Sequence, residues 1–455
     1  MHEQFLSLAE ESRDAPALID GPTGRVTTRA GLRDRARTLA GELAAAGLKG
    51  GDLVAIQLPN SVDFLAAWLA TLDLRLVLVP VDRDAPENEV AAILSQFGIK
   101  GLVYRSDRSS RSVAITTRTV TKRPPLPDDA RLVKLTSGST GKPKGIVASE
   151  ANLIADCNNI CSAMQIAPSD INLGAIPFSH SYGFSNLLTP LVMQGTAVVI
   201  SNDYLPQSIV DLCNEHRCTV APLIPMVFAH LAAVHRGHGE FETVRTFISA
   251  GAPLPATTSR RFRERFGVEI HSFYGCSECG GITYDRAGGA VERGSVGPAM
   301  RGVELEIHGA RLTVRSASVA LGYLIDDGTF QALENGRFLS DDLAEVRDDG
   351  EVVLTGRASD LINTAGKKVN PREVEQVILQ IDGVRQVKVY GEPAGARGEV
   401  VAAAVVADPD VTREQIREFC RTRLSLHKVP RIVKLIESIP VDERGKVKRA
   451  ALAAL

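Results

Sequence analysis

The chain has 455 residues, and its 52 Lys and Arg against 54 Asp and Glu give a formal net charge of −2. Hydrophobic residues make up 44% and charged residues 23%, a globular composition with room for two to four domains. This balance gives no support to a nucleic-acid or membrane-surface role that depends on net charge. The N-terminal segment has no basic stretch followed by a long apolar run, so a secretion signal is not expected, and no apolar run reaches the ~20 residues of a membrane span. We therefore expect a cytoplasmic protein.

The seven cysteines are expected to be reduced thiols, because their number is odd and no secretion signal precedes them. Cys276-x-x-Cys279 is a single pair, and no second Cys or His pair stands at zinc-finger spacing. A structural zinc site is therefore not expected.

Short apolar runs alternate with amphipathic stretches in the first part of the chain, which predicts βαβ units and a mainly parallel sheet. In chain order, the expected elements are a helix over 29–46, a strand over 54–58, a helix over 62–72, a strand over 76–79, a helix over 87–97, strands over 101–104 and 132–135, and a helix over 260–266.

The pattern changes after about residue 286. Alternating apolar residues over 303–314 and 343–354 predict a small antiparallel β region, with a hairpin turn at Asp348-Asp-Gly350. A separate α+β module is expected after Gly356-Arg357, which divides the chain into domains 1–356 and 357–455. The elements expected in this module are a helix over 371–380, strands over 384–390 and 400–406, and a helix over 413–424.

The sharpest local signal is the loop Leu135-Thr-Ser-Gly-Ser-Thr-Gly-Lys-Pro-Lys-Gly145. Its glycines can turn backbone N–H groups toward an anion, and its hydroxyls and lysines suit a polyphosphate. It is not a Walker A loop, because two residues separate Gly138 from Gly141 and Pro143 disfavours a helix starting at Lys142. The alternative is a flexible Gly/Ser linker, but the lysines and the preceding strand favour a phosphate loop.

The segment Thr136–Gly145 resembles the phosphate loop of the adenylate-forming superfamily, which comprises acyl-CoA synthetases, peptide-synthetase adenylation domains and luciferases. Further segments resemble the family's other motifs in the same order, over roughly residues 25 to 450. These are Tyr274-Gly-Cys-Ser-Glu278, Phe338-Leu-Ser-Asp-Asp342, Gly356-Arg-Ala-Ser-Asp-Leu-Ile362 with Gly366 and Pro371-Arg-Glu373, and Gly445-Lys446. In character the chain is most similar to carboxylic acid–CoA ligases.

The resemblance implies an α/β fold with two domains. The large N-terminal domain would consist of layered mixed sheets with helices plus a small β region. The small, mobile α+β C-terminal domain would carry the catalytic lysine and rotate about a hinge at Ser359 or Asp360.

The resemblance also implies a reaction that joins a carboxylate to the α-phosphate of ATP, expels pyrophosphate and then passes the acyl group to the thiol of CoA. Cations must offset the repulsion between the two anions. Lys446 would contact both the carboxylate and the α-phosphate, and Glu278 would hold Mg²⁺. Asp342 would accept hydrogen bonds from the ribose, and Arg357 would assist at the ribose or the pyrophosphate.

The remaining candidates follow from the same resemblance. Tyr274 would lie against the adenine, Gly366 would line the pantetheine path, and His180 would be a catalytic residue or a wall of the acyl pocket. The other candidates for nucleotide binding are Thr136, Ser137, Gly138, Ser139, Thr140, Gly141, Lys142, Lys144, Gly275 and Ser277. The other candidates for the acid pocket are Ser181, Tyr182, Ala250 and Gly251.

The sequence departs from the family's pattern at several positions. Ser277 replaces a threonine, Ser359 stands where the family has Asp or Lys, and Glu150 stands where many relatives have His. Relatives that activate amino acids place an Asp at the position of Ser181, so an α-amino acid is not expected. An aryl or medium-sized acid is preferred, because nothing points to a long tunnel.

Three alternatives remain. An acyl-AMP ligase would transfer the acyl group to an amine or to a carrier protein, which would be a separate chain because no carrier domain follows Leu455. A nucleotide-binding protein without catalysis is disfavoured because Lys446 and Glu278 are present, and an ATP hydrolase because the Walker A pattern fails. The expected partners are a small carboxylic acid, ATP and CoA, without nucleic acid, and a homodimer is left open.

Overall fold

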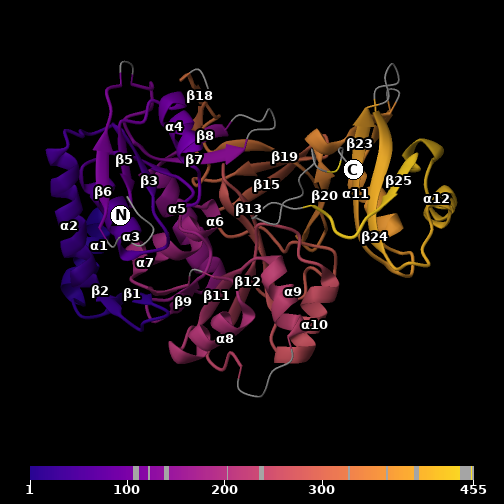
Figure 1. Ribbon diagram of the computed structural model, residues 1–455, viewed down its shortest axis with the longest axis horizontal. Helices are drawn as coiled ribbons and strands as arrows, with labels where there is room; N and C mark the ends of the chain where they lie inside the picture. The colour runs from indigo at the N-terminus through magenta and orange to yellow at the C-terminus, as the bar shows by residue number, and fades with distance from the viewer. Residues whose placement is uncertain are drawn as a thin grey trace. The chain divides into compact units, whose positions relative to one another are not determined.

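The structure is a computed structural model of residues 1–455. It describes the whole chain except residues 106–111, 121–122, 138–142, 202, 235–239, 326–327, 365–366, 394–398, 441–451 and 453–455. The chain divides into two compact units (Figure 1). The first comprises Met1–Leu305 and Val314–Phe338, and the second comprises Glu306–Thr313 and Leu339–Leu455.

The first unit contains a sheet in which eight described strands are ordered β14-β13-β12-β11-β9-β10-β1-β2. All pairs from β13 to β1 are parallel, and only the edge strands β14 and β2 are antiparallel. The strands β9, β10, β11 and β12 are almost entirely buried, as expected for parallel strands covered on both faces. In chain order the bounds are β1 (Pro16–Asp20), β2 (Val26–Thr28), β9 (Ile171–Gly174), β10 (Ala197–Ile200), β11 (Val220–Leu223), β12 (Thr246–Ser249), β13 (Ile270–Cys276) and β14 (Gly280–Tyr284).

A second sheet of eight described strands has the order β18-β17-β8-β7-β4-β3-β5-β6. Its central strands β7, β4, β3 and β5 are parallel, whereas β6 on one side and β8, β17 and β18 on the other are antiparallel to their neighbours. The bounds are β3 (Leu53–Gln57), β4 (Val77–Pro80), β5 (Gly101–Tyr104), β6 (Ala114–Thr117), β7 (Ala130–Ser137), β8 (Pro143–Ser149), β17 (Gly322–Leu324) and β18 (Phe330–Ala332). The predicted layered mixed sheets are thus confirmed.

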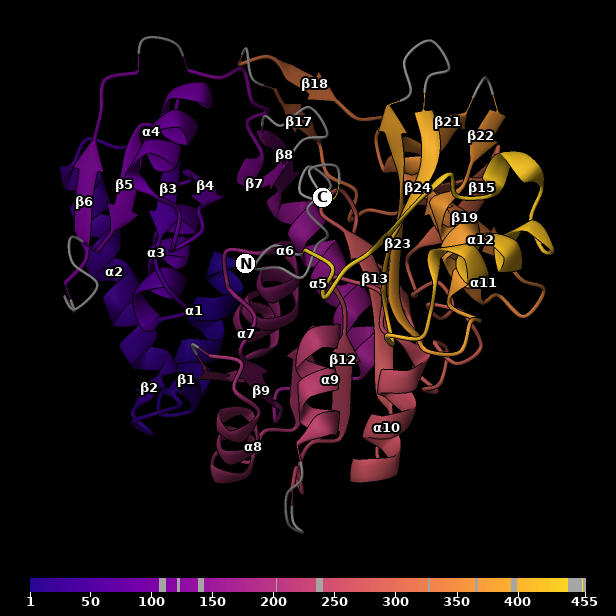
Figure 2. The same cartoon turned by 45° about the vertical axis from the view of Figure 1, so that its right-hand side comes forward.

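The helices of the first unit begin at sequence signals that cap them. Ser61 caps α3 by accepting a hydrogen bond from the N–H of Phe64, and Ser149 forms a capping box with Asn152 at the start of α5. Figure 2 shows α8, α9 and α10 standing beside the strands of the first sheet. The bounds are α1 (His2–Glu11), α2 (Arg29–Ala45), α3 (Val62–Asp73), α4 (Glu87–Gln96), α5 (Glu150–Met164), α6 (Ser181–Gly183), α7 (Thr189–Gln194), α8 (Pro206–Glu215), α9 (Pro225–Ala233) and α10 (Ala256–Phe266).

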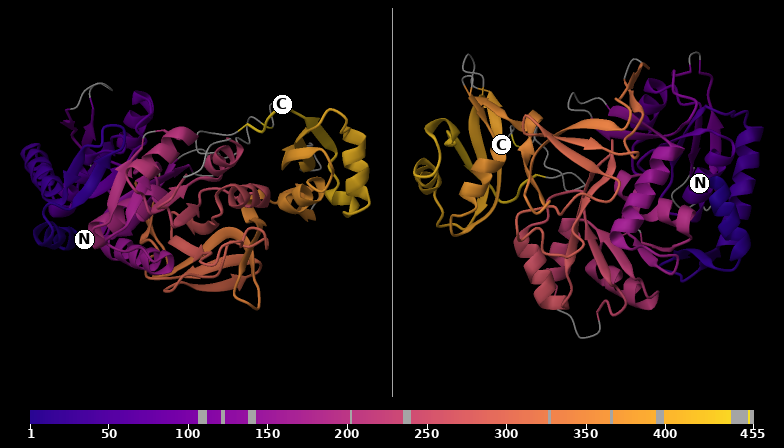
Figure 3. Two further views of the ribbon diagram at one scale, coloured as in Figure 1. Left: turned by 90° about the horizontal axis from the view of Figure 1, so that it is seen from below. Right: turned by 180° about the vertical axis from the view of Figure 1, so that it is seen from behind.

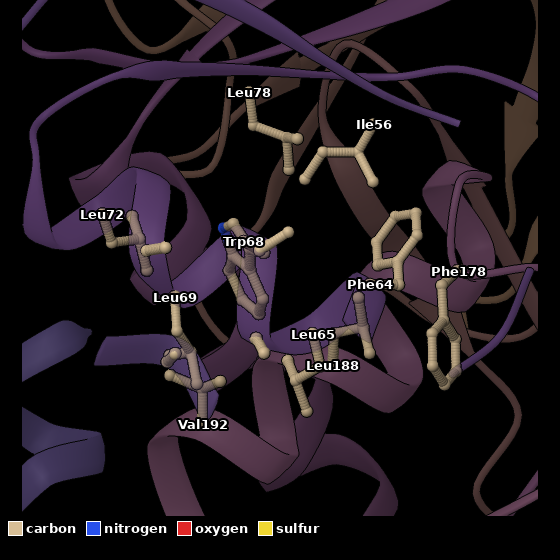
Figure 4. Packing of buried hydrophobic residues seen from close by; sticks show 14 of the residues in the cluster. Ile56, Phe64, Leu65, Trp68, Leu69, Leu72, Leu78, Phe178, Leu188 and Val192 are labelled. Carbon is tan, nitrogen blue, oxygen red and sulfur yellow. The ribbon is translucent and has the colours of Figure 1, made fainter. Parts of the chain in front are cut away.

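The largest apolar core of this unit surrounds α3 (Figure 4). Trp68 is fully buried, and its ring lies 4.6 Å from that of Phe184. Phe184 begins a π-helix, Phe184–Leu188, that runs directly into α7. Figure 3 shows the indigo helices of this region from two further sides, gathered at the N-terminus. In the described part of the chain, no helix combines the length and apolar composition needed to cross a bilayer.

The described part of the second unit has two sheets of more than two strands. One has the order β15-β16-β19-β20, and the other pairs β23 with β24 and β24 with β25. Its main core contains only residues from Ile362 onward, packed between β24 and the helices α11 and α12. The bounds are β15 (Glu304–His308), β16 (Arg311–Arg315), β19 (Arg337–Val346), β20 (Val352–Arg357), β21 (Ile362–Thr364), β22 (Lys367–Val369), α11 (Pro371–Ile378), β23 (Val384–Pro393), β24 (Glu399–Ala407), α12 (Arg413–Arg421) and β25 (Ile432–Leu435).

The predicted antiparallel region and hairpin turn are confirmed. β19 and β20 are antiparallel, and Gly350 in their connection has φ +83°. The N–H of Arg347 closes the turn on the carbonyl of Glu351 at 2.9 Å. The predicted helix over 413–424 is shorter in the structure, where α12 ends at Arg421. The N–H groups of Arg423 and Leu424 both donate to the carbonyl of Cys420, so the chain closes a final turn there and does not continue the helix.

Candidate active site

The predicted phosphate loop connects two antiparallel strands. β7 ends at Ser137 and β8 begins at Pro143, with the backbone of Thr136 opposite that of Lys144. A strand rather than a helix follows the loop, which confirms that it is not a Walker A arrangement. The Lys144 side chain is exposed. The candidates between these strands, Gly138, Ser139, Thr140, Gly141 and Lys142, lie outside the described residues.

The second motif occupies the end of β13 and the turn into β14. The N–H of Cys279 donates to the carbonyl of Cys276 at 3.3 Å, so Ser277 and Glu278 form the turn itself. The strand carries a bulge between Tyr274 and Gly275. A Cβ on Gly275 would lie 2.3 Å from the carbonyl oxygen of Gly280, so the close approach of the two strands requires glycine.

Glu278 contacts a tyrosine that the sequence did not single out. The hydroxyl of Tyr323, on β17, donates to Glu278 Oε1 at 3.0 Å. Lys144 Nζ lies 6.0 Å from the centroid of the Tyr323 ring. Burial, followed by the negative charge of Glu278, raises the pKa of Tyr323 well above its usual value, so the hydroxyl remains a donor. No neighbouring sequence pattern indicates this contact, because β17 joins the sheet beside β8 only in the tertiary structure.

The structure also joins the predicted acid pocket to the same turn. Ser181 Oγ lies 2.9 Å from Ser277 Oγ, although the two residues are 96 positions apart. The Tyr182 hydroxyl donates to the carbonyl of Ile248 at 2.9 Å, and its ring centroid lies 6.0 Å from that of Phe273. Burial raises the pKa of Tyr182 well above its usual value.

The other pocket candidates lie at the ends of nearby elements. His180 is partly buried and stands directly before α6, and its backbone N–H donates to the carbonyl of Pro177 at 3.1 Å. Ala250 and Gly251 follow the end of β12, and the N–H of Ala250 donates to the carbonyl of Leu223 at 3.4 Å. Gly251 has φ +86°, which an L side chain would strain. Their role as a pocket wall stays a prediction.

A buried carboxylate, Asp156 on α5, was missed by sequence reasoning. It is 3% exposed and accepts hydrogen bonds from Ser185 Oγ at 2.7 Å and the Gly281 N–H at 2.9 Å. Burial raises the pKa of Asp156, with the charge of Lys134 acting in the opposite direction. The available signal was an acidic residue on the apolar face of a helix, four positions before Ile160. Asp156 ties the start of β14 to the π-helix that follows the His180 segment.

Two candidates meet within the second unit. Arg357 Nε donates to Asp342 Oδ1 at 2.9 Å, and the two residues lie opposite each other in β20 and β19. Burial lowers the pKa of Arg357, but Asp342 and the neighbouring carboxylates outweigh burial and raise it. The hinge candidates Ser359 and Asp360 lie in a 3₁₀ turn, Ala358–Asp360, where Ser359 is hydrogen-bonded to Asp341. Gly366 and Lys446 lie outside the described residues.

The Glu278 carboxylate fits the way in which Mg²⁺ binds beside a nucleotide. Among the described residues, no group of three or more His, Cys, Asp or Glu side chains is placed to hold a metal. Mg²⁺ commonly binds through one or two carboxylates, with waters and substrate phosphates completing its octahedron. Glu278 fits that mode, because Tyr323 donates to Oε1, and Oε2 accepts no hydrogen bond from the described residues.

Comparison with known proteins agrees with this geometry. A model of the AMP-binding enzyme family matches residues 5–324, and a model of the AMP-binding enzyme C-terminal domain matches residues 373–446. The chain belongs to the AMP-binding enzyme family. The superfamily predicted from the sequence motifs is therefore confirmed, as is the prediction that the chain is an enzyme.

Individual relatives match this family member over nearly its whole length. Long-chain-fatty-acid–CoA ligase FadD13 of Mycobacterium tuberculosis is 27% identical, covering 96% of this chain and 94% of its own. Feruloyl-CoA synthase of Amycolatopsis is 28% identical, and the match covers 96% of this chain and 95% of the relative. The structure of amide bond synthetase McbA from Marinactinospora thermotolerans has 26% identity and a TM-score of 0.83, covering 100% and 99%.

Proposed function

We propose that the protein is an AMP-forming carboxylic acid–CoA ligase. The observation that carries this proposal is the contact between Ser181 and Ser277 at 2.9 Å. It brings the segment predicted to line the acid pocket against the turn predicted to hold Mg²⁺ through Glu278. An adenylating enzyme needs this proximity, because the acid must lie within reach of the α-phosphate. The names of the relatives FadD13 and feruloyl-CoA synthase support the same class.

In the first half-reaction, a carboxylate oxygen of the acid bonds to the α-phosphorus of ATP, and the bond to the bridging oxygen breaks to release pyrophosphate. Bound Mg²⁺ supplies positive charge to the phosphates. Glu278 would hold the ion, Lys144 would supply positive charge near the phosphates, and Lys446 would offset the charge of the carboxylate as it approaches. Asp342 accepts hydrogen bonds from the ribose while Arg357 holds its position.

In the second half-reaction, the CoA thiol gives its proton to solvent and its sulfur bonds to the acyl carbon, while the bond from that carbon to the phosphate oxygen breaks and AMP leaves. Gly366 lines the path of the pantetheine arm. The acid is aryl or medium-sized in this proposal, which the ring of Tyr182, next to Ser181 in the chain and 6.0 Å from the ring of Phe273, supports. Rotation of residues 357–455 about Ser359 or Asp360 separates the two half-reactions.

A second candidate keeps adenylation and changes the acceptor. The similarity to the amide bond synthetase McbA favours an acyl-AMP ligase that transfers the acyl group to an amine. A separate carrier protein could also accept it through the same phosphopantetheine chemistry as CoA. Both candidates require the same first half-reaction.

The test is exchange of labelled pyrophosphate into ATP, measured with a panel of aryl and aliphatic acids. We expect exchange that requires both an acid and Mg²⁺, followed by an acyl-CoA product on addition of CoA. Phosphate release without an acid and without exchange would contradict the proposal. Exchange with an amide product, but no thioester, would select the second candidate.

A further inference from the structure

Glu278 lies in a turn that the segment 318–323 contacts at three positions. Its backbone carbonyl accepts a hydrogen bond from the Ala320 N–H at 2.8 Å, and Ser318 Oγ donates to the carbonyl of Cys279 at 2.7 Å. These contacts hold the backbone of the turn and do not involve the Glu278 carboxylate. Within the described part of the chain, the hydrogen bond from Tyr323 at 3.0 Å holds the carboxylate.

The strand register explains why Tyr323 reaches this position. Tyr323 on β17 is paired with Ile146 on β8, and Lys144 lies two residues before Ile146. Side chains two positions apart on a strand share a face, so Tyr323 and Lys144 are diagonal neighbours. The ammonium of Lys144 lies 6.0 Å from the Tyr323 ring, at the outer limit of a cation–π contact. Tyr323 therefore touches both the predicted metal ligand and the end of the predicted phosphate loop.

We propose that Tyr323 is a positioning residue that orients the Glu278 carboxylate for Mg²⁺. Its hydroxyl occupies Oε1, so that Oε2 remains to coordinate the ion that accompanies ATP. Its ring also lies next to the ammonium of Lys144, near the position proposed for the phosphates. This inference rests on the proposed function, because it assigns a role relative to the metal ligand of that reaction.

The test is the variant Tyr323→Phe, which removes the hydroxyl and keeps the ring beside Lys144. A tenfold loss of affinity corresponds to about 1.4 kcal/mol, which is the order of magnitude expected for one hydrogen bond to a charged group. We expect the affinity for α,β-methylene-ATP, measured by calorimetry, to fall about tenfold in the presence of Mg²⁺. In EDTA the affinity should stay within about twofold of the wild type, because the nucleotide contacts are unchanged.

Tyr104→Phe is the matched control. Tyr104 lies on β5, close to the opposite end of the same sheet. This variant should bind the analogue like the wild type, with and without Mg²⁺. In pyrophosphate exchange, Tyr323→Phe should need about tenfold more Mg²⁺ for half-maximal rate, with the KM of the acid unchanged. A purely structural role would instead lower the Tm and weaken binding equally with Mg²⁺ and with EDTA.

Glu278→Gln separates failure of this inference from failure of the proposed function. If Glu278→Gln loses the effect of Mg²⁺ and Tyr323→Phe retains it, Tyr323 does not position the carboxylate. If the wild type binds the analogue equally well with Mg²⁺ and with EDTA, the metal role of Glu278 itself is wrong. Loss of the Mg²⁺ effect on analogue binding in both variants supports the positioning role.

Discussion

Lys446 carries a demanding prediction at the scale of single residues. The cation is needed while the carboxylate approaches the α-phosphate, but not while a thiol attacks an adenylate that already exists. Lys446→Ala should therefore reduce pyrophosphate exchange by a factor of about 100 or more, the range seen when an electrostatic stabiliser is removed. Conversion of supplied acyl-AMP to the thioester should continue at close to the normal rate. Equal loss of both half-reactions would show that the lysine does not have this role, and Lys448→Ala is the neighbouring control.

Asp156 predicts a pH dependence of stability. Because burial raises its pKa in the folded state, the folded protein retains this proton at a pH where the unfolded chain has released it. The contribution of Asp156 to stability is therefore greatest below its unfolded pKa and is lost as the pH rises through the folded pKa. Asn cannot ionise and keeps an oxygen to accept from Ser185 or Gly281. The denaturant midpoint of the wild type minus that of Asp156→Asn should thus fall between about pH 4 and the raised pKa, and a difference that rises with pH would contradict the assignment.

At the scale of elements, the turn between β13 and β14 depends on the fit of Gly280 against α5. Gly280 has φ +71°, and a Cβ built there would lie 2.1 Å from Asp156 Oδ1. Gly267, at the C-terminus of α10, has the same φ of +71° but no heavy atom within 4 Å of its Cβ position. Alanine variants of the two glycines therefore distinguish the free-energy cost of the backbone conformation from the cost of a steric clash.

Gly267→Ala should cost about 1 kcal/mol of unfolding free energy, the cost of placing an L residue in the left-handed region. Gly280→Ala should cost roughly 3 kcal/mol or more, because a buried carboxylate must move as well. Urea unfolding measures both. Equal losses in the two variants would mean that α5 can shift away from the turn without cost. Gly280→Ala should also weaken Mg²⁺-dependent exchange, since the displaced turn contains Glu278.

The elements themselves were largely predictable because their signals are local. The helix expected over 62–72 is α3, with Ser61 at its N-cap and Trp68 on its buried face. The rejection of a helix after the phosphate loop followed from the ring of Pro143, and β8 begins at that residue. In contrast, no local pattern placed β17 beside β8, since strand neighbours depend on how distant segments pack.

At the scale of the whole molecule, the second unit has an apolar core of its own. The main cluster contains only residues from Ile362 onward, and Tyr390 also donates to the carbonyl of Leu452 at 3.0 Å. A fragment of residues 357–455 should therefore unfold cooperatively by itself, with a single transition in far-UV circular dichroism. Shortening the fragment to end at residue 440 removes the Leu452 contact and should lower its midpoint. A non-cooperative fragment would place the boundary earlier, before the strands β19 and β20.

The motifs and their order determined the family from the sequence alone, because a phosphate loop, a capped helix and a turn are each set by a few adjacent residues. Composition and charge could say only that the chain is globular and nearly neutral. The tertiary structure decided which distant residues meet: Ser181 with Ser277, Tyr323 with Glu278, and Asp156 with Gly281. These pairs are 96, 45 and 125 positions apart. Contacts of this kind follow from strand order, register and the burial of polar groups, and the residues between the partners do not encode them.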